Sequence, residues 1–124
     1  MATDYKHFKL AEFDSPDQPG SGARMDLEFM HMLDRARSIA GVPFHINSGY
    51  RSKAHNAKVG GVANSPHLGG FAADIRCTGS RHRWQIISAL LAVGFNRIGV
   101  GQTFVHVDND PSKDEDVIWT YPNK

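Results

Sequence analysis

Apolar residues recur at helical spacing in two segments of the chain. In the first segment they lie three or four positions apart on one stripe, and three further side chains widen it: Phe29, Leu33, Ala36 and Ala40, with Met25, Met32 and Ile39. Asp26 favours the amino-terminal end of such a helix, and Gly41 is placed to terminate it. The pattern predicts an amphipathic helix between Asp26 and Gly41, with its methionines in the core.

A second stripe predicts another helix before Gly94. Its members are Trp84, Ile87 and Leu91, widened by Ile86, Leu90 and Val93. Ser80 precedes the stripe and is the expected N-cap, because its hydroxyl can accept a hydrogen bond from a free backbone amide of the first turn. Gly94 follows the last apolar residue and is expected to end the helix.

Five shorter segments combine β-branched or aromatic residues with turn residues at their borders, as strands do. They are Phe44–Ser48, Phe71–Cys77, Ile98–Val100, Phe104–Asp108 and Val117–Tyr121. The order of elements is helix, strand, long glycine-rich loop, strand, helix and then several strands. This order predicts an α+β fold with a small, mostly antiparallel sheet. We expect a single domain over residues 1–124.

Composition narrows the range of partners. Lys and Arg number 14 against 13 Asp and Glu, so no strong field favours nucleic acid or an anionic membrane, and we expect neither as a partner. Met1–Leu10 lacks the apolar core of a signal peptide, and no segment approaches a membrane span of roughly 20 apolar residues. Cys77 is the only cysteine, which excludes an internal disulfide, and we expect it to be buried and inert. We expect a monomer.

Two segments carry candidate metal chemistry. If Phe71–Cys77 is extended, Ala72 and Asp74 share one face, and in Phe104–Asp108 the same alternation places His106 and Asp108 on one face. Each strand can therefore point one ligand, Asp74 or His106, into a common cleft. His67 follows a glycine-containing loop and would supply the third ligand. Two imidazoles and one carboxylate suit zinc, and three protein ligands leave the open position that catalytic zinc uses.

The same residues resemble a known family. Ser65, His67, Gly70, Ala72 and Asp74 match the pattern Ser-x-His-x-x-Gly-x-Ala-x-Asp. With a later histidine, this pattern resembles the zinc signature of the D-Ala-D-Ala carboxypeptidase group of peptidoglycan metallopeptidases, which share a fold with the amino-terminal domain of hedgehog. The Ile46–Ser52 segment is similar to the family's Ser-x-Tyr-Arg-Ser element, and His7–Phe13 resembles the start of its short, single-domain members in phages and bacteria.

The resemblance implies one zinc ion per chain, held by His67, Asp74 and His106, and a peptidoglycan stem peptide as substrate. The activity would be that of a D-Ala-D-Ala carboxypeptidase or an L-alanyl-D-glutamate endopeptidase. Arg51 would bind substrate and take part in catalysis, with Ser65 as a supporting group. A protein made without a signal peptide and released to act on the bacterial cell wall fits a phage endolysin. The bond cleaved and the host are left open.

The general base is the least determined role. Asp108 is our candidate, because it lies two residues beyond His106 on the same face, about 7 Å along the strand. The alternative is that Asp108 orients a ligand histidine. Related families place an acidic residue before the last histidine, whereas Gly101–Phe104 contains none.

Two other functions stay open. In the first, His106 and Asp108 would be two of the three ligands of an Fe(II) facial triad, as in an oxygenase. Such a site requires a further histidine after Asp108 and a double-sheet barrel. A hedgehog-like domain that binds zinc without catalysis is the other alternative. The remaining histidines are expected to be ordinary solvent-exposed or hydrogen-bonded side chains: His7, His31, His45, His55 and His82.

Overall fold

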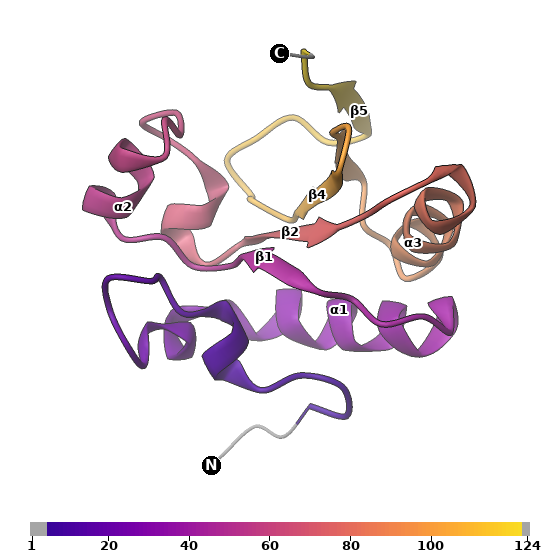
Figure 1. The fold of residues 1–124 in the computed structure, drawn as a ribbon, viewed down its shortest axis with the longest axis horizontal. Helices are drawn as coiled ribbons and strands as arrows, with labels where there is room; N and C mark the ends of the chain where they lie inside the picture. Colours follow the sequence, from indigo (N-terminus) through magenta and orange to yellow (C-terminus); the bar gives the residue numbers. More distant parts are fainter. Residues whose placement is uncertain (1–4, 123–124) are drawn as a thin grey trace.

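A computed structural model describes residues 5–122, which form a five-stranded sheet in the order β1-β2-β4-β3-β5 (Figure 1). The strands are β1 (Ile46–Ser48), β2 (Ala72–Arg76), β3 (Arg97–Val100), β4 (Phe104–Asp108) and β5 (Val117–Thr120). The pairings β1–β2, β2–β4 and β3–β4 are antiparallel, and β3–β5 is parallel. The expected α+β class with a mostly antiparallel sheet is confirmed.

The first predicted helix is α1 (Leu27–Ala40). Its N-cap is Asp26, whose carboxylate accepts a 3.0 Å hydrogen bond from the Phe29 amide, and this bond satisfies one of the free donors of the first turn. Gly41 ends the helix in the left-handed conformation, with φ of 70°. Both predicted ends are therefore confirmed.

The second predicted helix is α3 (Ser80–Ala92), but its start differs from the expectation. Ser80 is the first helical residue, and Gly79 is the N-cap, without a side-chain cap. Gly79 has φ of 82° and ψ of 158°, a backbone conformation that is accessible to glycine and strained for serine. The backbone dihedral angles at the start of α3 therefore favour glycine as the N-cap.

The predicted glycine-rich loop between β1 and β2 contains two helical segments. They are α2 (Lys53–Lys58) and a 3₁₀ helix, η3 (Pro66–Gly69). Ser52 caps α2 by accepting a hydrogen bond from the His55 amide. The only buried residue of α2 is the polar Asn56, so Lys53–Lys58 carries no apolar stripe. Hydrophobic periodicity therefore could not predict this helix. Two further 3₁₀ helices precede α1: η1 (Leu10–Phe13) and η2 (Ser21–Arg24).

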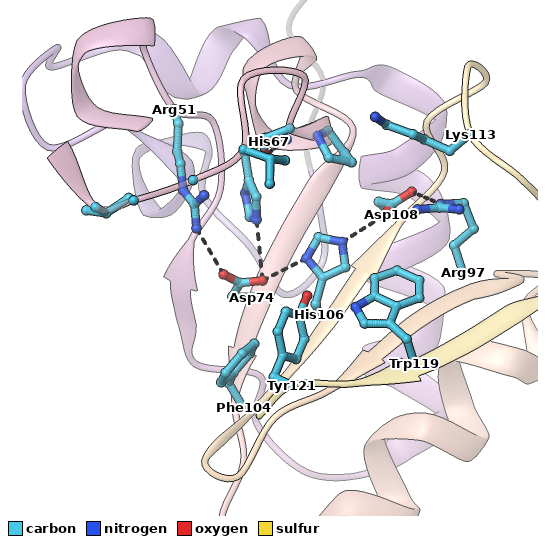
Figure 2. Close-up of a pocket in the computed structure, with 16 residues that line it drawn as sticks. Arg51, His67, Asp74, Arg97, Phe104, His106, Asp108, Lys113, Trp119 and Tyr121 are labelled. Atoms are coloured by element: carbon cyan, nitrogen blue, oxygen red, sulfur yellow. Dashed lines mark hydrogen bonds and ion pairs between the residues drawn. The ribbon is translucent and has the colours of Figure 1, made fainter. Parts of the chain in front are cut away.

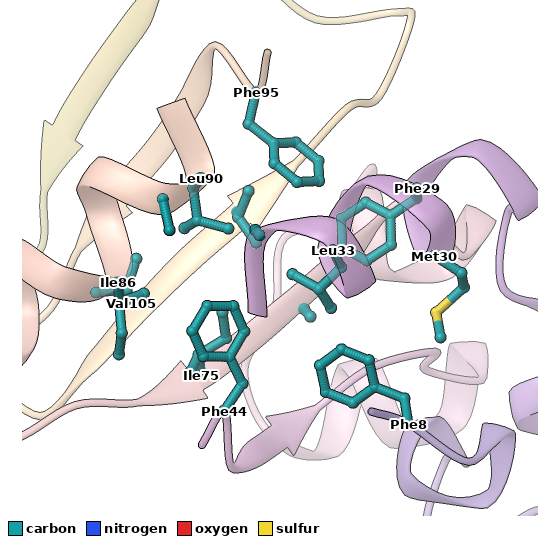
Figure 3. Close-up of a cluster of buried hydrophobic side chains, with 14 of the residues drawn as sticks. Phe8, Phe29, Met30, Leu33, Phe44, Ile75, Ile86, Leu90, Phe95 and Val105 are labelled. Atoms are coloured by element: carbon teal, nitrogen blue, oxygen red, sulfur yellow. The ribbon is translucent and has the colours of Figure 1, made fainter. Parts of the chain in front are cut away.

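The core lies between the sheet and helices α1 and α3 (Figure 3). Alternate strand residues face these helices and are fully buried: Ala73 and Ile75 of β2, and Val105 and Val107 of β4. Phe29 and Leu33 of α1 and Leu90 of α3 pack against them. The intervening residues of β2 and β4, including Asp74 and His106, belong to the opposite face. The sheet thus separates an apolar core from a polar face.

Two further expectations concern the burial of Cys77 and the presence of membrane-spanning helices. Cys77 is fully buried as a free thiol, and burial raises its pKa above the usual value, so it is poorly suited to nucleophilic chemistry. Within residues 5–122, no helix has the length and apolar character required to cross a bilayer.

Candidate metal centre and cleft

One row of residues crosses the whole sheet. Ser48, Asp74, His106, Gly99 and Trp119 are successive partners on β1, β2, β4, β3 and β5. Asp74 Oδ1 lies 2.9 Å from His106 Nδ1, because directly opposed residues of an antiparallel pair share a face. The predicted placement of these two side chains in one cleft is therefore observed.

His67 enters this cleft from η3. The Ser65 hydroxyl caps that short helix by accepting a hydrogen bond from the His67 amide, and Pro66 occupies its first turn. The His67 ring is buried, and its Nδ1–H donates to the Gly49 carbonyl at 2.7 Å. Its Nε2 lies 3.3 Å from Asp74 Oδ1. The structure thus brings all three predicted metal ligands together (Figure 2).

The hydrogen bonds around the two imidazoles suit a cation between them. The Gly49 carbonyl accepts a hydrogen bond from His67 Nδ1–H, and Asp108 Oδ2 accepts one from His106 Nε2–H at 2.6 Å. In the neutral rings, the other two nitrogens then carry lone pairs that face Asp74 Oδ1. The three donor atoms lie within 4.8 Å of one another, and tetrahedral zinc with ligands near 2.0–2.1 Å separates its ligand atoms by about 3.3 Å. The donor set therefore fits zinc.

The electrostatics of the group point the same way. Burial raises the pKa of the Asp74 carboxyl, but hydrogen bonds from His106 and His67 outweigh burial and hold that pKa below its usual value. Burial lowers the pKa of His106, but hydrogen bonds to Asp108 and Asp74 outweigh burial and raise it. The Asp74 carboxylate is thus favoured in its ionised form, which is the form that binds a metal ion.

Asp108, the candidate general base, is hydrogen-bonded to His106 and is not exposed to solvent. Its side chain is fully buried, at 0% exposure, and Oδ1 accepts a 2.6 Å hydrogen bond from Arg97 Nε. Burial raises the pKa of Asp108, but the hydrogen bonds from His106 and Arg97 outweigh it and lower that pKa. These contacts suit the alternative role, in which the carboxylate orients a ligand histidine.

Arg51 lies at one side of the centre. Its Nη2 is 3.2 Å from Asp74 Oδ2, the carboxylate oxygen that faces away from the two histidines. Its Nε donates to the Ser48 hydroxyl and its Nη1 donates to Asn56 Oδ1. Asn56 is buried and also donates to the Val62 carbonyl, so it connects Arg51 to the loop after α2. The guanidinium therefore lies in the cleft with a fixed orientation.

A cleft of about 440 Å³ opens above the three ligands. Its lining includes Arg51, Ser65, the loop at residues 59–62, Phe104, Lys113, Trp119 and Tyr121. Figure 2 shows Arg51 on one side and Lys113 and Trp119 on the other. Sequence patterns had not singled out Asn56, Arg97, Lys113, Trp119 or Tyr121 for this site. Trp119 and Tyr121 belong to a recognisable strand segment, but its parallel pairing with β3 places them here, and that long-range pairing has no local signal.

Comparison with protein families gives a match to the model of peptidase M15 over residues 6–108. The matched region contains β1, β2 and β4 and all three residues that converge on the centre. The chain belongs to the peptidase M15 family. No curated protein matches it.

Membership of the peptidase M15 family confirms the resemblance seen at Ser65–Asp74 and makes the protein a hydrolase of peptide bonds. The match ends at Asp108, so the wall formed by Lys113, Trp119 and Tyr121 lies outside the region that the family model covers. The other histidines are not part of the group of three: His7 pairs with Ser38, and His31 and His45 are exposed.

Proposed function

We propose that this peptidase M15 member is a zinc enzyme that hydrolyses peptide bonds in the stem peptides of peptidoglycan. The observation that supports it best is the convergence of His67, Asp74 and His106 on one point at the floor of a cleft. Peptide hydrolysis needs an electrophile for the carbonyl oxygen and an activated water, and a zinc ion bound to these three residues would supply both.

The protein's own groups then have distinct tasks. The Gly49 carbonyl and the Asp108 carboxylate hold the two imidazoles in the tautomers that present His67 Nε2 and His106 Nδ1. Arg97 neutralises the buried Asp108. Arg51 pairs with the outer oxygen of Asp74 and leaves Oδ1 directed at the histidines. Ser65 supports His67 through its backbone amide.

The charges of the cleft suit an acidic peptide. Arg51 and Lys113 lie on opposite sides of it (Figure 2), and stem peptides carry free carboxylates. A guanidinium can hold a carboxylate or a carbonyl oxygen through paired hydrogen bonds. The cleft is open to solvent, which fits a polymeric substrate, and a phage endolysin that reaches the wall after release is the context we propose. We also propose that one domain, as a monomer, performs this reaction.

The two alternatives differ in their requirements. A barrel-type Fe(II) site is disfavoured, because the described residues form one five-stranded sheet and no histidine follows Asp108. A zinc-binding domain without catalysis retains the same three ligands, so only an activity measurement separates it from the peptidase.

The test is digestion of purified sacculi and of a synthetic peptide ending in D-Ala-D-Ala, with new termini identified by mass spectrometry. Zinc-loaded protein should release defined stem-peptide fragments, and His106→Ala should release none. His45→Ala is the matched control, because His45 is exposed and lies outside the cleft. Stoichiometric zinc without cleavage of either substrate would support the non-catalytic alternative instead.

A further inference from the structure

The carboxyl-terminal segment contributes a tyrosine to the cleft from outside the family-matched region. Tyr121 directly follows β5 and lines the cleft with Trp119 and Phe104. Figure 2 shows its ring rising from the sheet, with the hydroxyl directed toward the side where Asp74 and His106 lie. The peptidase M15 match ends at Asp108, so Tyr121 lies outside the matched region.

The position of Tyr121 is fixed by several contacts. Its amide donates to the Val100 carbonyl at 3.2 Å, which continues the parallel pairing of β5 with β3. Its ring packs against Phe104, with centroids 5.0 Å apart, and against Trp119, with centroids 6.4 Å apart. Gly99 lies close to the rings of Trp119 in β5 and of Tyr121 directly after it. A Cβ at Gly99 would lie 2.8 Å from Tyr121 Cε2 and 2.7 Å from Trp119 Nε1, so glycine is required here.

The Tyr121 hydroxyl is a neutral donor. Burial raises the pKa of Tyr121 above its usual value, while the Trp119 indole as hydrogen-bond neighbour acts in the opposite direction. An indole N–H can only donate, so toward Trp119 the phenol oxygen is the acceptor. Within residues 5–122 the hydroxyl donates to no protein group, which leaves its proton available to a molecule in the cleft.

Three other polar side chains of the cleft, Arg51, Ser65 and Arg97, already contact protein groups. The Arg51 guanidinium donates to Ser48, Asn56 and Asp74. The Ser65 hydroxyl caps η3. Arg97 donates to the carboxylate of Asp108 and to the Asp114 carbonyl. Tyr121 thus places a hydroxyl donor at the cleft, while its ring and backbone hold it against Phe104, Trp119 and β3.

We propose that Tyr121 is a catalytic residue that donates a hydrogen bond to the carbonyl oxygen of the scissile peptide bond, an inference that rests on the proposed peptidase function. As water attacks the carbonyl carbon, a C–O bond forms and the π electron pair moves to the carbonyl oxygen. The phenol stabilises that negative charge without transferring its proton. The electron pair then returns, the C–N bond breaks, and the amine leaves with a proton that originates from the attacking water.

The test compares Tyr121→Phe with Tyr50→Phe, which removes a hydroxyl from a half-buried tyrosine outside the cleft lining. Zinc content and unfolding midpoint are measured first, to establish that both variants fold and bind metal. Hydrolysis of the muropeptide cleaved by the parent protein then gives kcat and KM. Tyr121→Phe should lower kcat by about 10²–10³-fold, the usual effect of losing one oxyanion donor, with KM within about threefold. Tyr50→Phe should match the parent.

A binding measurement provides a readout independent of turnover. Phosphinate analogues of D-Ala-D-Ala and of L-Ala-D-Glu place a charged oxygen where the carbonyl oxygen would be. Calorimetry should show at least tenfold weaker binding of the preferred analogue to zinc-loaded Tyr121→Phe than to the parent. An unchanged kcat, a change confined to KM, equal affinity for the analogue, or no binding of either analogue by the parent would each overturn the proposal. Absence of hydrolysis by the parent would refute the peptidase function and the catalytic role with it, and weaker analogue binding by the variant would then assign Tyr121 to ligand binding alone.

Discussion

Asp74 and His106 face each other across the β2–β4 ladder, with Oδ1 of the aspartate 2.9 Å from Nδ1 of the histidine. The opposite nitrogen of the same ring donates to Asp108, which in turn accepts from Arg97. A chain of four side chains thus runs from the proposed metal position to the partly exposed Arg97. Because the four side chains lie at different distances from the proposed metal position, their substitution should affect metal binding and activity differently.

Asp108→Asn separates the two roles open to this aspartate. Aspartate accepts hydrogen bonds from both His106 and Arg97, whereas asparagine has one acceptor oxygen and must leave one donor unpaired. We expect zinc affinity to fall by about 10–100-fold, as for other groups that orient a ligand histidine. Competition with a chelator measures this change, and the exposed Asp114→Asn is the control. Unchanged zinc affinity with kcat lowered by about 10²–10⁴-fold would assign the base role to Asp108 instead.

Arg51→Ala should reduce kcat/KM for muropeptides by about 10–100-fold, since charge-assisted hydrogen bonds to substrate are lost. Zinc should still bind with one ion per chain, because Arg51 contacts only the outer oxygen of Asp74. Arg51→Lys should recover part of the activity, because an ammonium cannot reproduce paired hydrogen bonds. Exposed Arg35→Ala is the control. Full activity in Arg51→Ala would remove this residue from substrate binding.

Asn56→Ala tests how Arg51 is held. The substitution removes the acceptor of Arg51 Nη1 and the donor to the Val62 carbonyl. We expect kcat/KM to fall by about tenfold and the free energy of unfolding to fall by about 1–3 kcal/mol, the cost of leaving a buried polar group unpaired. Asn64→Ala changes an exposed asparagine of the nearby loop and should have neither effect. Equal kinetics in the two variants would show that Arg51 needs no such support.

Phe29→Ala tests the core beneath the site. Phe29 is fully buried between α1 and the sheet and packs on Phe95 with ring centroids 5.4 Å apart. Its removal should lower the free energy of unfolding by about 3–5 kcal/mol, as for other large core truncations. Leu27→Ala, in the same helix but 56% exposed, should change it by less than about 0.5 kcal/mol. Urea titration of both variants measures this difference, and similar midpoints would contradict the assignment of the core.

The helices and strands with a strong hydrophobic period were predictable from sequence. The alternation in Phe104–Asp108 placed His106 and Asp108 on one face, and the hydrogen bond between His106 Nε2 and Asp108 Oδ2 confirms that shared face. Helix α2 was not predictable in this way, because it is polar on nearly all sides and is held by a serine cap and one buried asparagine. The prediction of Ser80 as the N-cap of α3 was wrong, because the N-cap is Gly79, whose φ of 82° and ψ of 158° favour glycine.

The wall formed by Trp119 and Tyr121 depends on contacts between distant segments. Their place beside His106 follows from the parallel pairing of β5 with β3 and from the missing side chain at Gly99. The Arg97–Asp108 pair likewise joins two strands, and only the fold shows which oxygen of Asp108 faces which donor. A pattern within one segment carries no information on such pairings.

The most direct test of the proposed centre is anomalous diffraction on crystals of the zinc-loaded protein, recorded on both sides of the zinc absorption edge. One peak per chain should appear within about 2.0–2.2 Å of His67 Nε2, an Asp74 carboxylate oxygen and His106 Nδ1. Absence of a peak at these three atoms in crystals with stoichiometric zinc, or a peak bound to other residues, would contradict the metal assignment and with it the proposed mechanism.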